Sequence, residues 1–249
     1  MIFTTSWDDG YQADMRIAQL LKDNGALGTF YISPKPQQEQ AMLGNEQIKA
    51  LSLGQEIGAH TISHTKLSSI NISEAEAEVV KSKKWLEGII KKECKMFCYP
   101  YGDFNKEVRI AVENAGFLAA RTVKDFKFDM VNRFEMPTTL HLYPFPCRRK
   151  YINWQHYLDP INPLITHWHD LNKCKIPLSA RRSWQSMARS LFTYALKTDQ
   201  PFFHLWGHAF ELDLYNLWND LEDFLQFVAK HPISYKTNGQ LAELFPTQQ

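Results

Sequence analysis

The sequence has almost no charge imbalance, because 28 Lys and Arg residues face 27 Asp and Glu residues, for a formal net charge of +1 over 249 residues. A chain without excess positive charge does not attract nucleic acid or an anionic membrane, so we expect neither as a partner. The sequence also lacks an apolar run near the ~18 residues of a transmembrane segment, and it lacks the basic and apolar regions of an export signal. We therefore expect a cytoplasmic protein.

Cysteine is scarce as well. The four cysteines, Cys94, Cys98, Cys147 and Cys174, form no Cys-x-x-Cys pair and are too few for a disulfide framework. Free thiols in a reducing compartment are expected, and a structural zinc site built from cysteine is not. No internal repeat or low-complexity tract is present, so a repeat protein is not predicted either.

Hydrophobic residues make up 44% of the chain, which is enough to bury the core of one large domain over residues 1–249. Strand patterns and helix patterns alternate along it. The expected strands cover residues 2–5, 28–32, 56–59, 96–98, 117–123, 201–206 and 233–235, and the expected helices cover residues 13–24, 45–54, 73–90, 105–115, 183–197 and 217–228. Short links between them favour parallel strands, and hence an α/β barrel or a doubly wound sheet. Residues from about 138 to 200, rich in Pro, His, Trp and Arg, interrupt the alternation and are expected to form an irregular and partly helical elaboration over the site.

Two adjacent acids, Asp8 and Asp9, follow the first strand directly and precede Gly10. Neighbouring carboxylates repel each other, so the pair is tolerable if a cation neutralises one and the other is kept for acid–base chemistry. A polar turn without function is the alternative, because Asp-Asp-Gly is also common turn chemistry.

Two histidines, His60 and His64, follow the third strand at i and i+4 and can converge on one metal ion. Other polar residues follow or end predicted strands in the same way, namely residues 99–102 (Tyr-Pro-Tyr-Gly), Arg121 and His208. In parallel α/β barrels the active site forms at the carboxyl ends of the strands, so these residues are expected to meet there.

Together these residues resemble the polysaccharide deacetylases, also called carbohydrate esterase family 4 or the NodB-homology group. The family's opening Thr-Phe-Asp-Asp-Gly is similar to Ser-Trp-Asp-Asp-Gly at residues 6–10, and its His-(Ser/Thr)-x-x-His motif is matched at residues 60–64. Its Pro-Tyr-Gly motif is matched at residues 100–102. The order and spacing of the motifs agree to about residue 123. Beyond that, only the region of His208 and the C-terminal helix and strand are similar.

The resemblance implies a distorted (β/α) barrel and a hydrolase with one divalent metal ion. It implies Asp8 as the catalytic base and Asp9, His60 and His64 as the metal ligands. Zinc suits two imidazoles and one carboxylate, although Fe²⁺, Co²⁺ and Ni²⁺ fit the same trio. Such a site would hydrolyse an amide or ester, with the backbone N–H of Tyr101 helping to stabilise the oxyanion.

The sequence departs from the family at Cys98, which stands where many members carry an arginine that contacts the catalytic aspartate. Arg121, at the end of the next strand, is predicted to supply that charge; a surface arginine is the alternative. The family's Asp-x-x-Asp-Trp motif has no clear counterpart near Asp125 or Asp129. The catalytic acid is predicted to be His208, because it closes a strand, with His204 as the alternative or as a core histidine.

The predicted function is removal of an N-acetyl group from an acetamido sugar, as an intermediate of capsule or O-antigen synthesis. Predicted substrate contacts come from five residues: Trp7, Pro100, Tyr101, His204 and Trp206. Three more tryptophans in the irregular segment are candidate sugar platforms, namely Trp154, Trp168 and Trp184. Two alternatives stay open, a hydrolase of a non-sugar amide and a carbohydrate-binding relative without catalytic activity.

Overall fold

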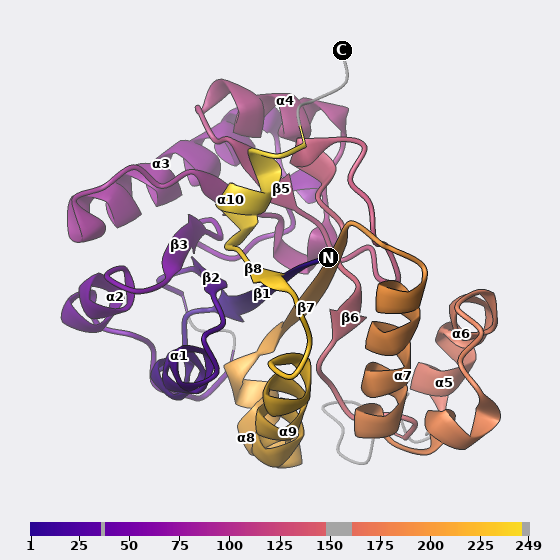
Figure 1. Ribbon diagram of the computed structural model, residues 1–249. Coiled ribbons are helices and arrows are strands. Elements are labelled where there is room, and N and C mark those ends of the chain that lie inside the picture. The colour runs from indigo at the N-terminus through magenta and orange to yellow at the C-terminus, as the bar shows by residue number, and fades with distance from the viewer. Residues whose placement is uncertain (36–37, 148–160, 246–249) are drawn as a thin grey trace.

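A curved, parallel β-sheet forms the centre of the protein in the computed structural model, which describes residues 1–35, 38–147 and 161–245 (Figure 1). In spatial order its strands are β5 (Ala119–Arg121), β4 (Met96–Cys98), β3 (Glu56–Ala59), β2 (Gly28–Ile32), β1 (Ile2–Asp9), β7 (Phe202–His208) and β6 (Leu140–His141). A further strand, β8 (Ser234–Tyr235), pairs with the start of β1. All pairings between these strands are parallel.

Helices surround this sheet and connect its strands (Figure 1). They are α1 (Asp14–Asp23), α2 (Asn45–Leu51), α3 (Ile72–Ile90), α4 (Lys106–Asn114), α5 (Asn162–Thr166), α6 (Trp168–Lys173), α7 (Trp184–Lys197), α8 (Ala209–Tyr215), α9 (Trp218–Val228) and α10 (Asn238–Ala242). The predicted distorted (β/α) barrel is confirmed. Within the described ranges, no helix has both the length and the apolar character needed to cross a membrane.

The central strand β1 is longer than the predicted segment 2–5, because it continues to Asp9 and is buried from Phe3 onward. Phe3 anchors it in an aromatic core. Its ring stacks on Phe203 of β7 at 6.0 Å and meets the edges or faces of Phe192 in α7 and Phe224 in α9. Packing of this kind fixes β1 between the sheet and its covering helices, so the two acids at its end have a rigid support.

The segment at residues 136–142 joins the two outer ends of the sheet. The Met136 amide donates to the Ala120 carbonyl oxygen in β5, one outer strand of the sheet, whereas residues 140–141 form β6, the other outer strand, and the Leu142 amide donates to the Trp206 carbonyl oxygen in β7. Seven residues of the described chain therefore connect the two outer strands and nearly close the barrel. Part of the predicted elaboration at 138–200 thus belongs to the barrel wall, and the prediction of an irregular segment is wrong there.

Local signals explain which element bounds were correct. The helix expected from residue 183 is α7, which Ser183 caps because its side chain accepts from the Ser186 amide. The helix expected from residue 73 begins at Ile72, because Asn71 caps α3 by accepting from the Glu74 amide. The helix expected at residues 217–228 is α9, and a shorter helix that was not predicted, α8, precedes it and is separated from it by the left-handed backbone of Asn216 (φ 56°). The assignment of residues 1–249 to one domain stays a prediction.

Candidate active site

Seven of the eleven predicted site residues line a cavity of about 560 Å³ at the carboxyl ends of the strands. It is lined by Asp8, Asp9, Gln38, His60, His64, Tyr101, Val123, Asp125, His141, Trp206, His208, Phe210 and Glu211. Residues separated by up to two hundred positions in the chain are brought together because parallel strands present their carboxyl ends at the same rim. This is the placement expected from the strand-end pattern in the sequence.

The turn after β1 directs Asp9 into this cavity through an uncommon backbone conformation. Asp9 has φ 81° and Gly10 has φ 89°. A side chain at residue 10 would also collide with Ile32, since a Cβ there would lie 2.6 Å from the Ile32 Cγ2 atom. Glycine is therefore required at position 10, and the non-glycine positive φ at Asp9 is backbone strain of the kind found at functional sites.

Asp9, His60 and His64 present three ligand atoms to one point. The His60 Nε2 and His64 Nε2 atoms lie 3.1 Å apart, and the Asp9 Oδ1 atom lies 3.2 Å from His64 Nε2 and 3.7 Å from His60 Nε2. Ligand atoms bound to a tetrahedral zinc ion at about 2.0–2.1 Å are about 3.3 Å apart. The spacing fits a divalent metal ion of this size without rearrangement of the strands.

The chemistry of the three residues also fits a metal. His60 donates from Nδ1 to the Cys98 carbonyl oxygen at 2.8 Å, which directs its Nε2 lone pair to the site. Burial lowers the pKa of His60 to about 4, so the imidazole is neutral at physiological pH. The Asp9 Oδ1 atom is buried and forms no hydrogen bond within the described part of the chain. A buried carboxylate oxygen without a donor is costly, and a cation would satisfy it.

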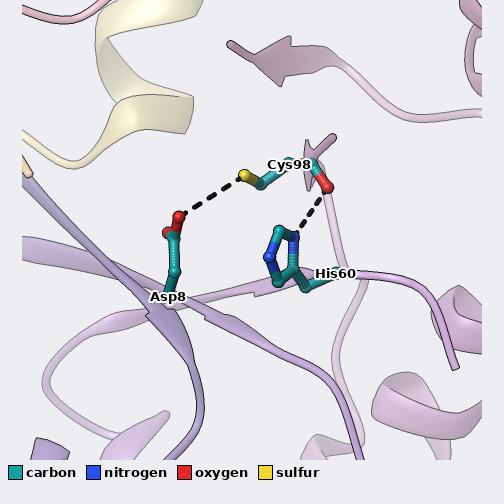
Figure 2. Close-up of side chains that lie close together, drawn as sticks. All are labelled: Asp8, His60 and Cys98. Atoms are coloured by element: carbon teal, nitrogen blue, oxygen red, sulfur yellow. Dashed lines mark hydrogen bonds between the residues drawn. The ribbon is translucent and has the colours of Figure 1, made fainter. Parts of the chain in front are cut away.

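Asp8, the predicted base, forms a buried ion pair with Arg121, whose guanidinium NH2 donates to Asp8 Oδ1. On the other side, the Cys98 thiol donates to Asp8 Oδ2 at 3.9 Å, as Figure 2 shows. Burial raises the pKa of Asp8, but the charge of Arg121 and the nearby histidines outweigh burial and leave the pKa below its ordinary value. Asp8 is therefore ionised and able to accept a proton.

Arg121 is fully buried behind Asp8 and does not line the cavity. Its guanidinium lies 4.7 Å from the Trp206 ring centre and 5.3 Å from that of Tyr31, in cation–π contact with both. The surface-arginine alternative is excluded by this burial. Arg121 contacts the predicted base, as the sequence suggested, from the strand beside Cys98.

His208, the predicted acid, is held by Glu211 on the first turn of α8. His208 Nδ1 and His141 Nε2 each lie 3.0 Å from the same carboxylate oxygen, Glu211 Oε2. Burial lowers the pKa of His208, but the Glu211 carboxylate and the two adjacent aspartates raise it to about 9. His208 is thus protonated at neutral pH, as a general acid must be.

The paired His208 is expected to make the stability of the metal-free protein depend on pH. Its folded pKa of about 9 lies above the ordinary value of 6.5, so the stabilisation is complete below about pH 6.5 and is lost as the pH rises through about 9. The difference corresponds to about 3 kcal/mol. Urea unfolding of chelator-treated protein across this range should show the loss.

Glu211→Gln removes the charge that raises the His208 pKa and should remove most of this decrease in the free energy of unfolding. Glu76→Gln, the same change at an exposed position of α3, is the matched control and should retain the decrease. An undiminished pH dependence in Glu211→Gln would contradict the assigned ion pair.

Two of the five predicted substrate contacts line the cavity and three do not. Tyr101 lies at the rim, 56% exposed, with its ring 4.8 Å from that of His64, and Trp206 forms part of the wall. Trp7, Pro100 and His204 are buried in the core away from the cavity lining, and the prediction that they contact substrate is wrong. Trp7 points to the opposite side of β1 from Asp8, because alternate side chains of a strand point to opposite sides. His204 points to the same side of β7 as Trp206 and His208, but it is fully buried inside the barrel and bonded to Ser6.

His204 is a core histidine. Its Nε2 atom is 2.8 Å from the Ser6 hydroxyl oxygen and its Nδ1 atom is 3.1 Å from the Pro137 carbonyl oxygen. Burial lowers the pKa of His204 to about 3, so it is not an imidazolium at neutral pH and is not suited to act as the general acid. His208 is the histidine that reaches the cavity.

The other candidate sugar platforms lie outside the cavity lining. Trp184 is buried and donates its indole N–H to the His141 carbonyl oxygen, and Trp168 is 45% exposed beside Arg181. Trp154 lies outside the described residues. None of the three lines the cavity.

Four polar residues of the cavity were missed from the sequence, namely Gln38, Asp125, His141 and Glu211. The Glu211 carboxylate accepts hydrogen bonds from both His141 and His208. Asp125 accepts a hydrogen bond from the Trp206 indole N–H at 2.8 Å. His141 ends a strand of only two residues, and Glu211 lies in the first turn of a short helix. The one available signal was Glu211 three residues after His208, a spacing at which a helix places two side chains together.

Comparison with known proteins gives one family. A sequence model of the family described as polysaccharide deacetylase matches residues 2–120. The protein YxkH of Bacillus subtilis (strain 168), which carries the name of that family, is 29% identical over 114 residues. That match covers 45% of this chain and 41% of YxkH, so this chain matches less than half of its curated relative.

Solved structures of similar fold extend over the whole chain. One is a Mycobacterium smegmatis protein named for the same family, with a TM-score of 0.68 and 13% identity, covering 100% of this chain and 92% of the other. Another is a carbohydrate esterase family 4 pseudoenzyme from Bacillus anthracis, with a TM-score of 0.55 and 14% identity, covering 97% of this chain and 65% of the other. At 13–14% sequence identity, the similarity to these two structures shows the fold alone. The family model ends one residue before Arg121, so His141, His208 and Glu211 lie beyond it.

Proposed function

Because the chain belongs to the polysaccharide deacetylase family, we propose that it is a metal-dependent hydrolase that removes the N-acetyl group of an acetamido sugar. The observation that carries the proposal is the convergence of Asp9, His60 and His64 at metal-ligand spacing beside the ionised Asp8. A metal-binding trio next to an independent base is the arrangement needed to hydrolyse an amide with water.

In this proposal Asp9, His60 and His64 hold one divalent ion, most suitably Zn²⁺. When bound, the ion supplies Lewis-acid polarisation of the amide carbonyl and acidifies water. Asp8, oriented by Arg121, takes the proton of the attacking water. His208, protonated and paired in register with Asp8 on the neighbouring strand β7, gives its proton to the leaving amine, which is a poor leaving group without it. The backbone N–H of Tyr101 is the proposed second contact to the oxyanion.

The size of the cavity supports a substrate of one or two sugar units at the reacting position. A volume of about 560 Å³ is within the range of small-molecule sites, and Trp206 offers an apolar ring in its wall. We further propose that the substrate is a precursor of surface polysaccharide, in the capsule or O-antigen class, and that the reaction is cytoplasmic. The free cysteines support a reducing compartment.

The function is tested by measuring metal content and acetate release together. Purified protein loaded with Zn²⁺ should release acetate from at least one sugar in a panel of acetamido monosaccharides, nucleotide-linked sugars and lipid-linked sugars. His60→Ala removes one of three ligands and should lower metal affinity by about 10–100-fold or more, with loss of acetate release. His169→Gln, at an exposed histidine of α6, is the control and should leave metal content and turnover unchanged.

Two results would redirect the proposal. Turnover of cyclic amides or ureides, with no acetate from any sugar, would support the non-sugar amide hydrolase. Zinc binding without any turnover would support an inactive carbohydrate-binding relative. The second alternative has a structural motivation in Cys98, which replaces the arginine common in the family, but Arg121 contacts Asp8 in its place. If the wild type binds no divalent metal, the proposed hydrolase is wrong.

A further inference from the structure

A second group of ligand atoms lies in the same cavity, apart from the Asp9 trio. It consists of His141 at the end of β6, His208 at the end of β7 and Glu211 on the first turn of α8. His141 Nε2 and His208 Nδ1 are each 3.0 Å from Glu211 Oε2, and all three ligand atoms lie within 4.8 Å of one another. The group shares no residue with the Asp9 trio.

The donor set and its spacing suit zinc. Two imidazole nitrogens and one carboxylate oxygen are ordinary zinc ligands, and such atoms lie about 3.3 Å apart around a tetrahedral ion. Two of the three distances are already close to this value. The chain also holds the ligands in place, since Glu211 is 2% exposed and His141 stacks on Trp206 with ring centres 3.9 Å apart and an interplanar angle of 12°. Little ordering would be needed on binding.

We propose that His141, His208 and Glu211 form a second zinc site, filled after the first, and that zinc bound there inhibits the enzyme. It fills second because its nitrogens are hydrogen-bonded to Glu211, so zinc must replace both hydrogen bonds, and each nitrogen that binds zinc must give up its proton, either to the other nitrogen of its ring or to solvent. The Asp9 Oδ1 atom of the first site has no hydrogen bond of this kind to lose. The inhibitory effect rests on the proposed function, because it follows from removing His208 as the proton donor. The binding of the second zinc ion does not depend on the proposed function.

The binding is tested by equilibrium dialysis against ZnCl₂ with elemental analysis of the protein. The wild type should bind a first and then a second equivalent of zinc per chain. His141→Gln should bind only the first, and His60→Ala should retain only the weaker one. His169→Gln, the same substitution at an exposed histidine of α6, should still bind two equivalents. Glu211→Gln serves as a second variant that removes a ligand of the same site and should also bind one equivalent.

The binding result stands apart from activity. A wild type that never exceeds one equivalent, or a His141→Gln variant that still binds two, overturns the second site. In the activity assay, wild-type acetate release should rise with the first equivalent and fall by about 10²-fold with the second, since a general acid contributes at least this factor. His141→Gln should lack the fall. If no sugar is turned over, the proposed function fails, and dialysis still decides the second site. If two equivalents bind without inhibition, the inhibitory role is wrong.

Discussion

Asp8→Asn is expected to slow acetate release by about 10²–10⁴-fold while the protein keeps its metal ion. The side chain lines the cavity and is ionised, because Arg121 and the nearby histidines lower its pKa despite burial. Asparagine has nearly the same shape but cannot accept a proton from water. The proposed metal ligands are the three neighbouring residues Asp9, His60 and His64, so zinc content should be unchanged. Steady-state kinetics and elemental analysis on the same preparation measure both quantities.

The same substitution leaves the buried guanidinium of Arg121 without its counter-ion, which can cost about 3–5 kcal/mol of stability. Asp8→Glu separates this effect from catalysis. Glutamate keeps the negative charge for Arg121 but moves the carboxylate by one methylene, so this variant should fold well, hold metal and still be slow. Near wild-type turnover in Asp8→Asn with metal bound would show that Asp8 is not the base.

Three strands at the centre of the sheet could be predicted from the sequence because their signals are local. Residues 28–32, 56–59 and 96–98 were predicted as strands with the bounds that β2, β3 and β4 have. Each is a short buried run between turn or helix signals. Parallel order then places their carboxyl ends at one rim, so the meeting of Asp8, Asp9, His60 and His64 followed from the strand ends.

Side-chain direction and long-range register could not be predicted in this way. Trp7 adjoins Asp8 in sequence but points into the core, whereas His141 comes from a two-residue strand in a segment expected to be irregular. Glu211 becomes part of the site only because α8 starts directly at the end of β7. The positions of these three side chains depend on the barrel geometry, which cannot be predicted from a local pattern in the sequence.

The position of Arg121 could be predicted only in part. Its strand-end position was visible in the sequence, and its contact with Asp8 was a hypothesis that depended on the order of β4 and β5 across the sheet. The structure pairs Cys98 with Arg121 in register on these two neighbouring strands. Both side chains contact the Asp8 carboxylate, the thiol at Oδ2 and the guanidinium at Oδ1. An arginine that serves Asp8 can therefore enter from either strand.

Arg121→Ala is expected to be the most destabilising of the substitutions considered, because it leaves the buried Asp8 carboxylate without its cation at a cost of about 3–5 kcal/mol. It also removes the charge that lowers the Asp8 pKa, so any folded fraction should be slow at neutral pH. Chemical denaturation and acetate release measure the two losses. The control is Lys124→Ala, three residues after Arg121 in the sequence. This substitution breaks a solvent-accessible ion pair with Glu135 and should lower the free energy of unfolding by no more than about 1 kcal/mol.

The positions of Cys98 and Arg121 make a rescue experiment possible. In the double variant Arg121→Ala with Cys98→Arg, the new guanidinium starts from the strand next to the one that lost it and can reach the same carboxylate. We expect it to regain part of both the stability and the activity. Cys98→Arg alone should instead destabilise the protein, because two buried guanidinium groups would compete for one carboxylate. If the double variant is no better than Arg121→Ala, Arg121 acts through its packing against Trp206 and Tyr31 rather than through its charge on Asp8.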